Sequence, residues 1–378
     1  MSSKLTETPH NLDVDNALSS LVDSSTVRTS SILETSALDE CRKACLLAWY
    51  SFYQHPGPQV DDRISRLSRK AYHLGLHQID SQSNLSSFGW DLVGEEVLEE
   101  WRHVWWSIYI LDSHLSYSTA TPAQIQPDSI GTALFRAWVS ALPDWGSQVK
   151  IFIPADQADL WKAVQEIVTV GGQHIFSLHI AVSVLLKEAV AVHRRSRQQP
   201  RYSARERISA LEDCLCGIQL SLPFNYMRTT RDVVAGETAA SYHCRLLTLL
   251  KLQLVQLILG LPRRQLDGPQ LQAAWRDNLG ICYGLFEHIC QWNMQCDLTI
   301  DPELCMIVTG LLVLLHLHTN SGGISNSSPL AQITRRKEVL RVVLQNHAKQ
   351  WTLARLLLAT MVWYGEPRYH WASKISAK

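Results

Sequence analysis

Apolar side chains follow a helical pattern in residues 99–125, which read EEWRHVWWSIYILDSHLSYSTATPAQI and contain a pair of adjacent tryptophans. They recur at steps of three and four residues, the spacing that places side chains on one face of an α-helix. The residues on this face are Trp101, Val104, Trp105, Ile108, Leu111 and Leu115, with Trp106 and Tyr109 widening it. A helix that is apolar over so much of its circumference needs partners on more than one side. The pattern therefore predicts a core helix, which Pro122 should end because proline lacks the amide donor.

The same periodicity predicts further helices along the chain. They cover residues 38–52, 60–76, 157–192 with a bend near Gly171 and Gly172, 208–219, 242–261, 271–294, 302–318, 333–351 and 352–363. Gly75 is expected either to turn the chain where the second helix ends or to pack in the interior of that helix. Asp156 or one of its neighbours is expected to cap the long helix. Residues 79–94 are expected to form a loop. Because no alternating strand pattern stands between hairpin turns, we expect an all-α array of packed antiparallel helices.

The two ends of the chain differ from this helical region. Residues 1–37 are rich in Ser and Thr and lack periodicity, so they are expected to form a disordered tail. One helical domain is expected over residues 38–363, followed by a C-terminal tail over 364–378. The amino terminus lacks the pattern of a secretory signal, and the longest apolar run, 304–317, is too short to span a membrane.

Composition narrows the classes of function. Of the 378 residues, 46% are hydrophobic and 19% charged, which is typical of an apolar globular protein. The formal net charge is zero, whereas a protein that binds nucleic acid through its overall charge should be basic. The nine cysteines are an odd number in a chain without a signal peptide, which favours reduced thiols in a nuclear or cytosolic compartment.

The core helix also carries a family resemblance. It resembles the middle homology region of the fungal-specific transcription factor domain, which follows a binuclear zinc cluster in many fungal regulators. The matching residues are Glu99, Arg102, Trp105, Trp106, Tyr109, Asp112, Leu115, Ser116, Pro122 and Ile125, preceded by Leu74, Gly75, Leu76 and His77. Trp101 and His103 stand where the family usually has arginine. The later helix resembles the family through Tyr242 and His243, and the resemblance covers roughly residues 38–363.

The resemblance implies a nuclear regulator of a metabolic gene set, secondary metabolism included. Its expected partners are other transcription factors or a second copy of the chain, and a small metabolite is a candidate effector. No Cys-x-x-Cys repeat followed by a further Cys occurs, so the family's zinc cluster is missing from this sequence. Direct DNA binding is therefore not expected unless an upstream exon supplies the cluster. A helical co-regulator or scaffold that binds another transcription factor is the alternative, and a helical enzyme is a weaker one.

Residues 194–207, RRSRQQPRYSARER, form a concentrated basic run. Such a run is typical of a nuclear import signal or a phosphate-contacting patch. The candidate import residues are Arg194, Arg195, Arg197 and Arg201. The competing interpretation is a solvated linker followed by the first turn of the next helix.

Signals for catalysis or cofactors are weak. Glu100 and His103 have the spacing of a metal-binding helical bundle, but such bundles need a second Glu-x-x-His pair, which the sequence lacks. The chain also lacks Gly-x-Ser-x-Gly, a phosphate-binding glycine loop and His-Glu-x-x-His. We therefore predict no catalytic residue, metal ligand or cofactor. Arg102 and Asp112 are charges on the apolar helix, so both should be paired and hydrogen-bonded.

Overall fold

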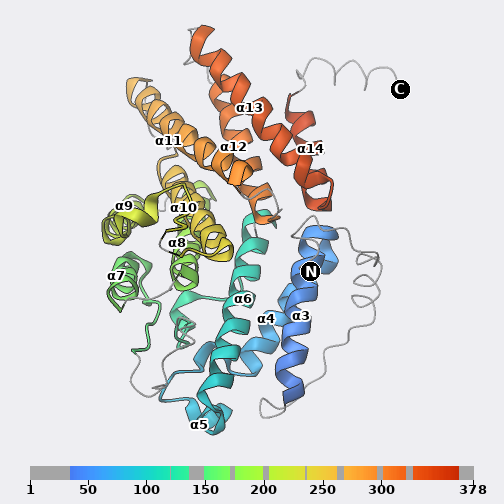
Figure 1. The fold of residues 1–378 in the computed structure, drawn as a ribbon, viewed down its shortest axis with the longest axis vertical. Helices are drawn as coiled ribbons and strands as arrows, with labels where there is room; N and C mark the ends of the chain where they lie inside the picture. The colour runs from blue at the N-terminus through green and yellow to red at the C-terminus, as the bar shows by residue number, and fades with distance from the viewer. Residues whose placement is uncertain are drawn as a thin grey trace. The chain divides into compact units, whose positions relative to one another are not determined.

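The computed structural model describes residues 35–119, 121–135, 149–170, 175–198, 204–234, 236–261, 268–295, 301–320 and 327–365. Every regular element in these ranges is a helix, so the prediction of an all-α fold is confirmed. The chain divides into two compact units (Figure 1). The described part of the first comprises residues 35–52 and 57–259, and that of the second comprises 53–56 and the residues from 260 onward. One domain over 38–363 stays a prediction.

The first unit begins with α3 (Thr35–Gln54) and α4 (Pro58–His73). Helix α3 begins at Thr35, so the expected tail boundary at residue 37 is too late, because the helix has one more turn. The rest of the expected tail, residues 1–34, lies outside the described residues. Proline at the first position of α4 suits a helix start, since its missing N–H would have no partner there. The buried face of α4 consists of Val60, Ile64, Leu67, Ser68 and Ala71.

Helix α4 ends earlier than its apolar pattern predicts, because Gly75 turns the chain. Its φ of 72° is in the left-handed region, which side chains with a Cβ rarely adopt. A Cβ at this position would also overlap the ring of Phe88. The expected turn at Gly75 is therefore confirmed, and two independent constraints require glycine there.

The connection between α4 and α6 is more ordered than the expected loop. It contains η1 (Leu76–Gln78), α5 (Leu85–Phe88) and η2 (Trp90–Leu92). Trp90 is buried, and its Nε1 donates to the carbonyl oxygen of Gly75 over 3.2 Å. Its ring lies edge-on to Trp101 at 5.8 Å. A polar-looking stretch therefore carries a core residue.

Helix α6 (Glu95–Thr119) is the core helix that the sequence predicts, and it starts directly after the stretch 79–94 that was expected to precede it. Its buried residues come from nearly all sides: Leu98, Glu99, Trp101, Arg102, Val104, Trp105, Trp106, Ile108, Tyr109, Leu111, Asp112, Ser113, His114, Leu115 and Ser116. Helices α4 and α8 pack against it (Figure 1). The helix ends at Thr119, shortly before Pro122, as expected.

The remainder of the first unit contains η3 (Pro127–Ser129), η4 (Gln157–Asp159), α7 (Leu160–Val170), α8 (Ile175–Gln198), α9 (Arg205–Ser221), η5 (Phe224–Met227) and α10 (Ala239–Leu259). The long helix expected over 157–192 corresponds to η4, α7 and α8, and the bend expected near Gly171 and Gly172 falls in residues 171–174, which lie outside the described part. Asp156 caps η4 by accepting from the amide of Ala158 over 2.9 Å.

Helix α8 pairs extensively with α10 and also contacts α6, α7 and α9. Among the described residues, it is the helix long and apolar enough to cross a membrane by length and composition alone. However, 72% of that window is buried inside the protein, as in the core helix of a helical assembly.

The second unit consists mainly of α11 (Gly268–Gln295), α12 (Glu303–Asn320), α13 (Ser327–Ala348) and α14 (Thr352–Gly365). Helix α12 contacts the other three and buries Leu304, Val308, Leu311 and Leu315 at helical spacing. Helix α14 continues to Gly365, two residues past the expected domain end at 363. The rest of the expected C-terminal tail, 366–378, lies outside the described residues.

Candidate functional site

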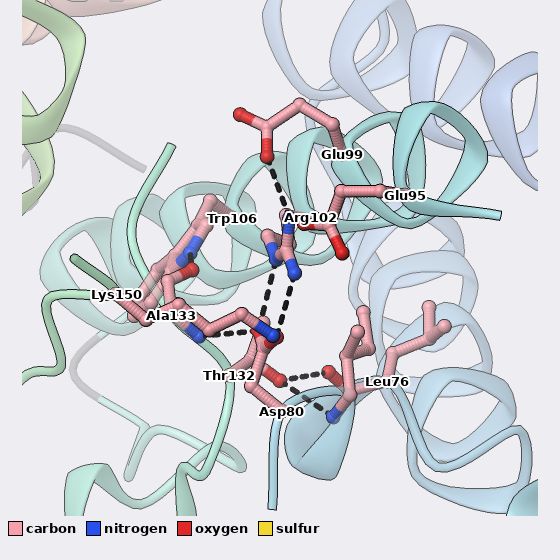
Figure 2. A network of polar contacts seen from close by, with 10 residues as sticks. Leu76, Asp80, Glu95, Glu99, Arg102, Trp106, Thr132, Ala133 and Lys150 are labelled. Atoms are coloured by element: carbon pink, nitrogen blue, oxygen red, sulfur yellow. Dashed lines mark hydrogen bonds and ion pairs between the residues drawn. The ribbon is translucent and has the colours of Figure 1, made fainter. Parts of the chain in front are cut away.

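A cluster of charged side chains surrounds Arg102 on α6, and Figure 2 shows it from close by. The Arg102 cluster consists of Asp80, Glu95, Glu99, Arg102 and Lys150. Arg102 donates from Nε and Nη2 to the two carboxylate oxygens of Asp80, over 2.9 and 2.6 Å. Its Nη1 donates to Glu99 over 2.7 Å and to Glu95 over 2.8 Å. Lys150 donates to Asp80 over 2.7 Å from an exposed position.

The two central side chains of the Arg102 cluster are shielded from water, since Arg102 and Asp80 are each only 1% exposed. Burial alone opposes the charge on Arg102, but hydrogen bonds and charge from Asp80, with Glu99 and Glu95, raise its pKa above the ordinary value. Burial likewise opposes the charge on Asp80, yet Arg102, Lys150 and the amide of Ala133 lower its pKa. Both groups therefore stay charged, and each depends on the other.

The Arg102 cluster fastens two segments that are distant in sequence. Asp80 also accepts from the amide of Ala133 over 2.9 Å, and Thr132 Oγ1 donates to the carbonyl oxygen of Leu76 over 2.6 Å (Figure 2). The amide of Gly131 donates to the carbonyl oxygen of His77 over 2.6 Å. The chain after Pro122 thus returns to lie along the stretch that follows Gly75.

Aromatic rings pack beside the hydrogen bonds that join residues 76–80 to residues 131–133. The rings of Tyr72 and His77 lie 5.9 and 6.3 Å from Trp105, and burial lowers the pKa of His77. Trp106 Nε1 donates to the carbonyl oxygen of Ala133 over 2.9 Å, and its ring lies 5.5 Å from Tyr109. Two family-matching stretches, Leu74 to His77 and the α6 motif, are therefore brought together in one interior. Leu74 itself is half-buried and ends α4, its amide donating to Lys70.

A second buried ion pair lies further along α6, where Lys187 of α8 donates to Asp112 over 3.1 Å. Asp112 also accepts from the amides of Gln124 and Ile125, over 2.9 and 3.1 Å. The Lys187 ammonium lies 4.3 Å from the centre of the Tyr109 ring. Burial lowers the pKa of Lys187, although the Asp112 charge acts in the opposite direction. The expectation that Asp112 and Arg102 are paired charges is confirmed.

The end of α6 is held by the basic run. Arg194 donates from its two terminal nitrogens to the carbonyl oxygens of Thr121 and Ser116, over 2.8 and 2.7 Å. Ser116 Oγ donates to Thr121 over 2.8 Å, while Pro122 is exposed beyond the helix. Cations near the last carbonyls of a helix are favourable because these carbonyls lack intrahelical partners. Arg194 thus has a structural role.

The other candidate import residues are distributed differently. Arg195 pairs with Glu188 over 3.2 Å, Arg197 is exposed, and Arg201 lies outside the described residues. Arg207 at the start of α9 pairs with Glu188 and Asp156 over 3.0 and 2.5 Å. The run therefore ends one helix and begins the next, and its role in nuclear import stays a prediction.

The structure gives the Glu100 and His103 pair no metal-binding geometry. Glu100 pairs with Arg42, and the His103 ring stacks on Phe135 with centroids 4.0 Å apart. Within the described ranges, no group of three or more His, Cys, Asp or Glu side chains could hold a metal ion. Burial raises the pKa of the Cys45 thiol to about 12, so this cysteine is a small core residue.

A third group of buried polar contacts surrounds Arg245 on α10, which was not identified from the sequence. Arg245 donates to Glu237 over 2.7 and 2.9 Å, and to the carbonyl oxygens of Tyr226 and Thr230 over 3.0 and 3.1 Å. A further bond joins it to the carbonyl oxygen of Arg228. Asp80, Lys150 and Lys187 were missed as well. The signal for Lys187 and Arg245 is a charged residue within a mainly apolar helix.

These features define a helical protein whose buried charges fasten its connecting segments to its core helices. The chain matches no protein-family model, no curated protein and no solved structure.

Proposed function

We propose that this chain is a nuclear transcriptional regulator of a metabolic gene set, similar to the fungal regulatory domain. The observation that supports the proposal is that the two stretches that resemble the family, Leu74 to His77 and the α6 motif, pack in the same interior. Asp80, just after His77, holds Arg102 in the α6 motif, and the backbone of Leu76 and His77 is bonded to the chain after Pro122. Residues chosen by the resemblance therefore share one interior.

The chemistry of these residues suits a regulatory scaffold better than an active site. Arg102 and Asp112 are each only 1–2% exposed, and their charges are engaged by Asp80, Lys187 and backbone amides. A catalytic acid or base must reach a substrate proton. These charged groups instead join one segment of the chain to another.

Transcript sequencing after deletion of the gene tests this proposal. We expect a limited set of metabolic transcripts to change and the full chain to restore them. Restoration should fail with Arg102→Met, which removes the central charge of the Arg102 cluster. The matched control is Arg66→Met, since Arg66 pairs with Asp62 on the exposed face of α4. An unchanged transcriptome in the deletion strain would contradict the proposal.

The second candidate is a co-regulator that acts only as a binding partner of another transcription factor. The zero net charge favours it, since phosphate neutralisation drives most DNA affinity. Occupancy of the chain at its target promoters, measured by chromatin immunoprecipitation, should then vanish when the DNA-binding partner is deleted. Occupancy that persists without any such partner would point to direct DNA binding instead.

A further inference from the structure

The last turn of α9 and the connection to α10 expose several large apolar side chains within a short stretch of sequence. They are Leu220, Phe224, Met227, Val233 and Val234, and we call them the 220–234 surface. Phe224 is 84% exposed and Val234 fully exposed. Single exposed apolar residues are common, but several within a short segment indicate an interaction site. Elsewhere in the described residues, no stretch of the same length exposes more than three such side chains.

The backbone beneath this surface is held in place from the inside. Arg245 is buried and binds the carbonyl oxygens of Tyr226, Arg228 and Thr230. Tyr242 Oη donates to the carbonyl oxygen of Thr229 over 2.6 Å. A surface that is already ordered loses less conformational entropy when it binds. The exposed side chains are therefore presented on a preformed support.

Positive charge accompanies the apolar side chains. Arg228 and Arg231 are both exposed, and the Arg228 guanidinium lies 5.7 Å from the centre of the Phe224 ring. Arg231 donates to the carbonyl oxygen of Glu237 over 2.8 Å. The Glu237 carboxylate accepts hydrogen bonds from the guanidinium of Arg245 and from the amide of Asp232. Within the described part of the chain, neither exposed arginine has a carboxylate at ion-pair distance.

We propose that the 220–234 surface binds an acidic, amphipathic segment of another protein. Its apolar residues would pack on Phe224 and Val234, and its carboxylates would pair with Arg228 and Arg231. Arginine beside an aromatic ring is a frequent combination at the centre of protein interfaces. This proposal does not depend on the proposed role in transcription.

The exposed arginines favour an acidic segment of another protein over two alternative partners, a second copy of this chain and a membrane. In a symmetric dimer the same patch occurs on both sides, so the arginines of one copy would face like charges on the other. Without a lipid chain, binding to a membrane surface is typical of an amphipathic helix with a long apolar face and many Lys and Arg residues on its polar face. Two arginines and a few apolar side chains around the four-residue η5 do not form such a helix.

Fluorescence anisotropy with the full chain tests the proposal. The probe is a labelled peptide of Leu, Phe and Glu with its apolar residues on one helical face. Two matched peptides replace Glu by Lys, or Leu and Phe by Ser. We expect saturable binding of the first peptide alone. Because a central aromatic residue carries much of the energy of an interface, Phe224→Ala should weaken binding about tenfold or more.

Variant proteins separate the apolar and charged contributions. Arg228→Glu with Arg231→Glu should weaken binding and reverse the peptide preference, since opposite charge governs partner choice. The controls are Leu356→Ala and Arg66→Glu, which change an exposed apolar residue and an exposed arginine elsewhere. All variants lie on the surface and should fold, which thermal unfolding checks.

Several outcomes would overturn the proposal. They are equal binding of the three peptides, no binding, or binding that survives both sets of variants. Sedimentation showing a dimer that Phe224→Ala converts to a monomer would assign the surface to a second copy of the chain. Phe224-dependent binding to vesicles of anionic lipid, without peptide binding, would assign it to a membrane.

Discussion

Arg102 and Arg245 are both buried arginines on long helices of the first unit, but their partners differ. Arg102 binds three carboxylates, and its closest partner, Asp80, is as deeply buried as Arg102 itself. Arg245 binds one carboxylate and three backbone carbonyl oxygens of a single loop. The first arginine therefore joins core segments, while the second supports a loop whose outer side is apolar.

The difference shows how one residue type serves two purposes. A buried ion pair that loses one member leaves an uncompensated charge in the interior. A carbonyl in a surface loop that loses its donor can bind water after a small movement. Removal of Arg102 should therefore affect the stability of the unit, whereas removal of Arg245 should affect the order of one loop.

The largest effect is expected for Arg102→Met, because it leaves the buried carboxylate of Asp80 without its main partner. The free energy of unfolding should fall by about 3–5 kcal/mol, measured by urea denaturation of the full chain. Arg66→Met, which breaks an exposed pair, should change it by less than about 1 kcal/mol. Equal stability of the two variants would show that the Arg102 cluster is not a core element.

A smaller effect is expected for Asp112→Asn, which removes the charge that neutralises Lys187 but keeps the shape. The loss should be about 2–3 kcal/mol, because Lys187 is left buried and two loop amides lose a charged acceptor. Adding Lys187→Met should recover part of the loss. Simple additivity of the two changes in the same denaturation experiment would argue against coupling between them.

Arg245→Met sharpens the comparison with Arg102→Met because the two substitutions are chemically identical. We expect a loss of about 2 kcal/mol, because the Glu237 carboxylate, which is 10% exposed, loses its cation while the released carbonyls can reach water. Hydrogen exchange should accelerate in residues 226–238 and stay unchanged in α6. If exchange in α6 rose as much as in Arg102→Met, the distinction between core and loop support would be wrong.

The smallest effect is expected from mild acid, and His318 in the second unit contributes the part that is tested. Burial also lowers the pKa of other histidines, which add to the same effect: His77, His103, His193, His316 and His347. Burial lowers the pKa of His318 from 6.5 to about 4, so the folded state keeps this ring neutral while the unfolded chain takes up a proton. Stability is therefore complete above pH 6.5 and is lost as the pH falls toward 4. Asp80 and Glu237, whose pKa values are lowered, keep their charge over that range.

Unfolding measured as a function of pH tests this expectation. Between neutral pH and about pH 5.5 the loss should be about 1 kcal/mol. His318→Gln should flatten this part of the curve, whereas an exposed substitution such as Leu356→Ala should leave it unchanged. If the free energy of unfolding of His318→Gln depended on pH as steeply as that of the unchanged protein, His318 would not contribute to the loss of stability in mild acid.

The sequence alone determined the helices with strong periodicity. Helix α6 was identified by its run of apolar residues, and the turn at Gly75 by a glycine at a helix end. The need to pair Arg102 and Asp112 also follows from the sequence, since both are charges on an apolar helix. These features depend on local spacing and on the cost of burying charge, both of which can be read from neighbouring residues.

Only the tertiary structure decided which partners satisfy those charges. Asp80 lies in a polar stretch with the composition of a loop, and Lys187 lies 75 residues after Asp112. Trp90 and Arg245 likewise gain their roles from segments that approach in space. Hydrogen-bond partners distant in sequence depend on how the helices pack, and helical periodicity specifies only which face of a helix is buried, not what covers it.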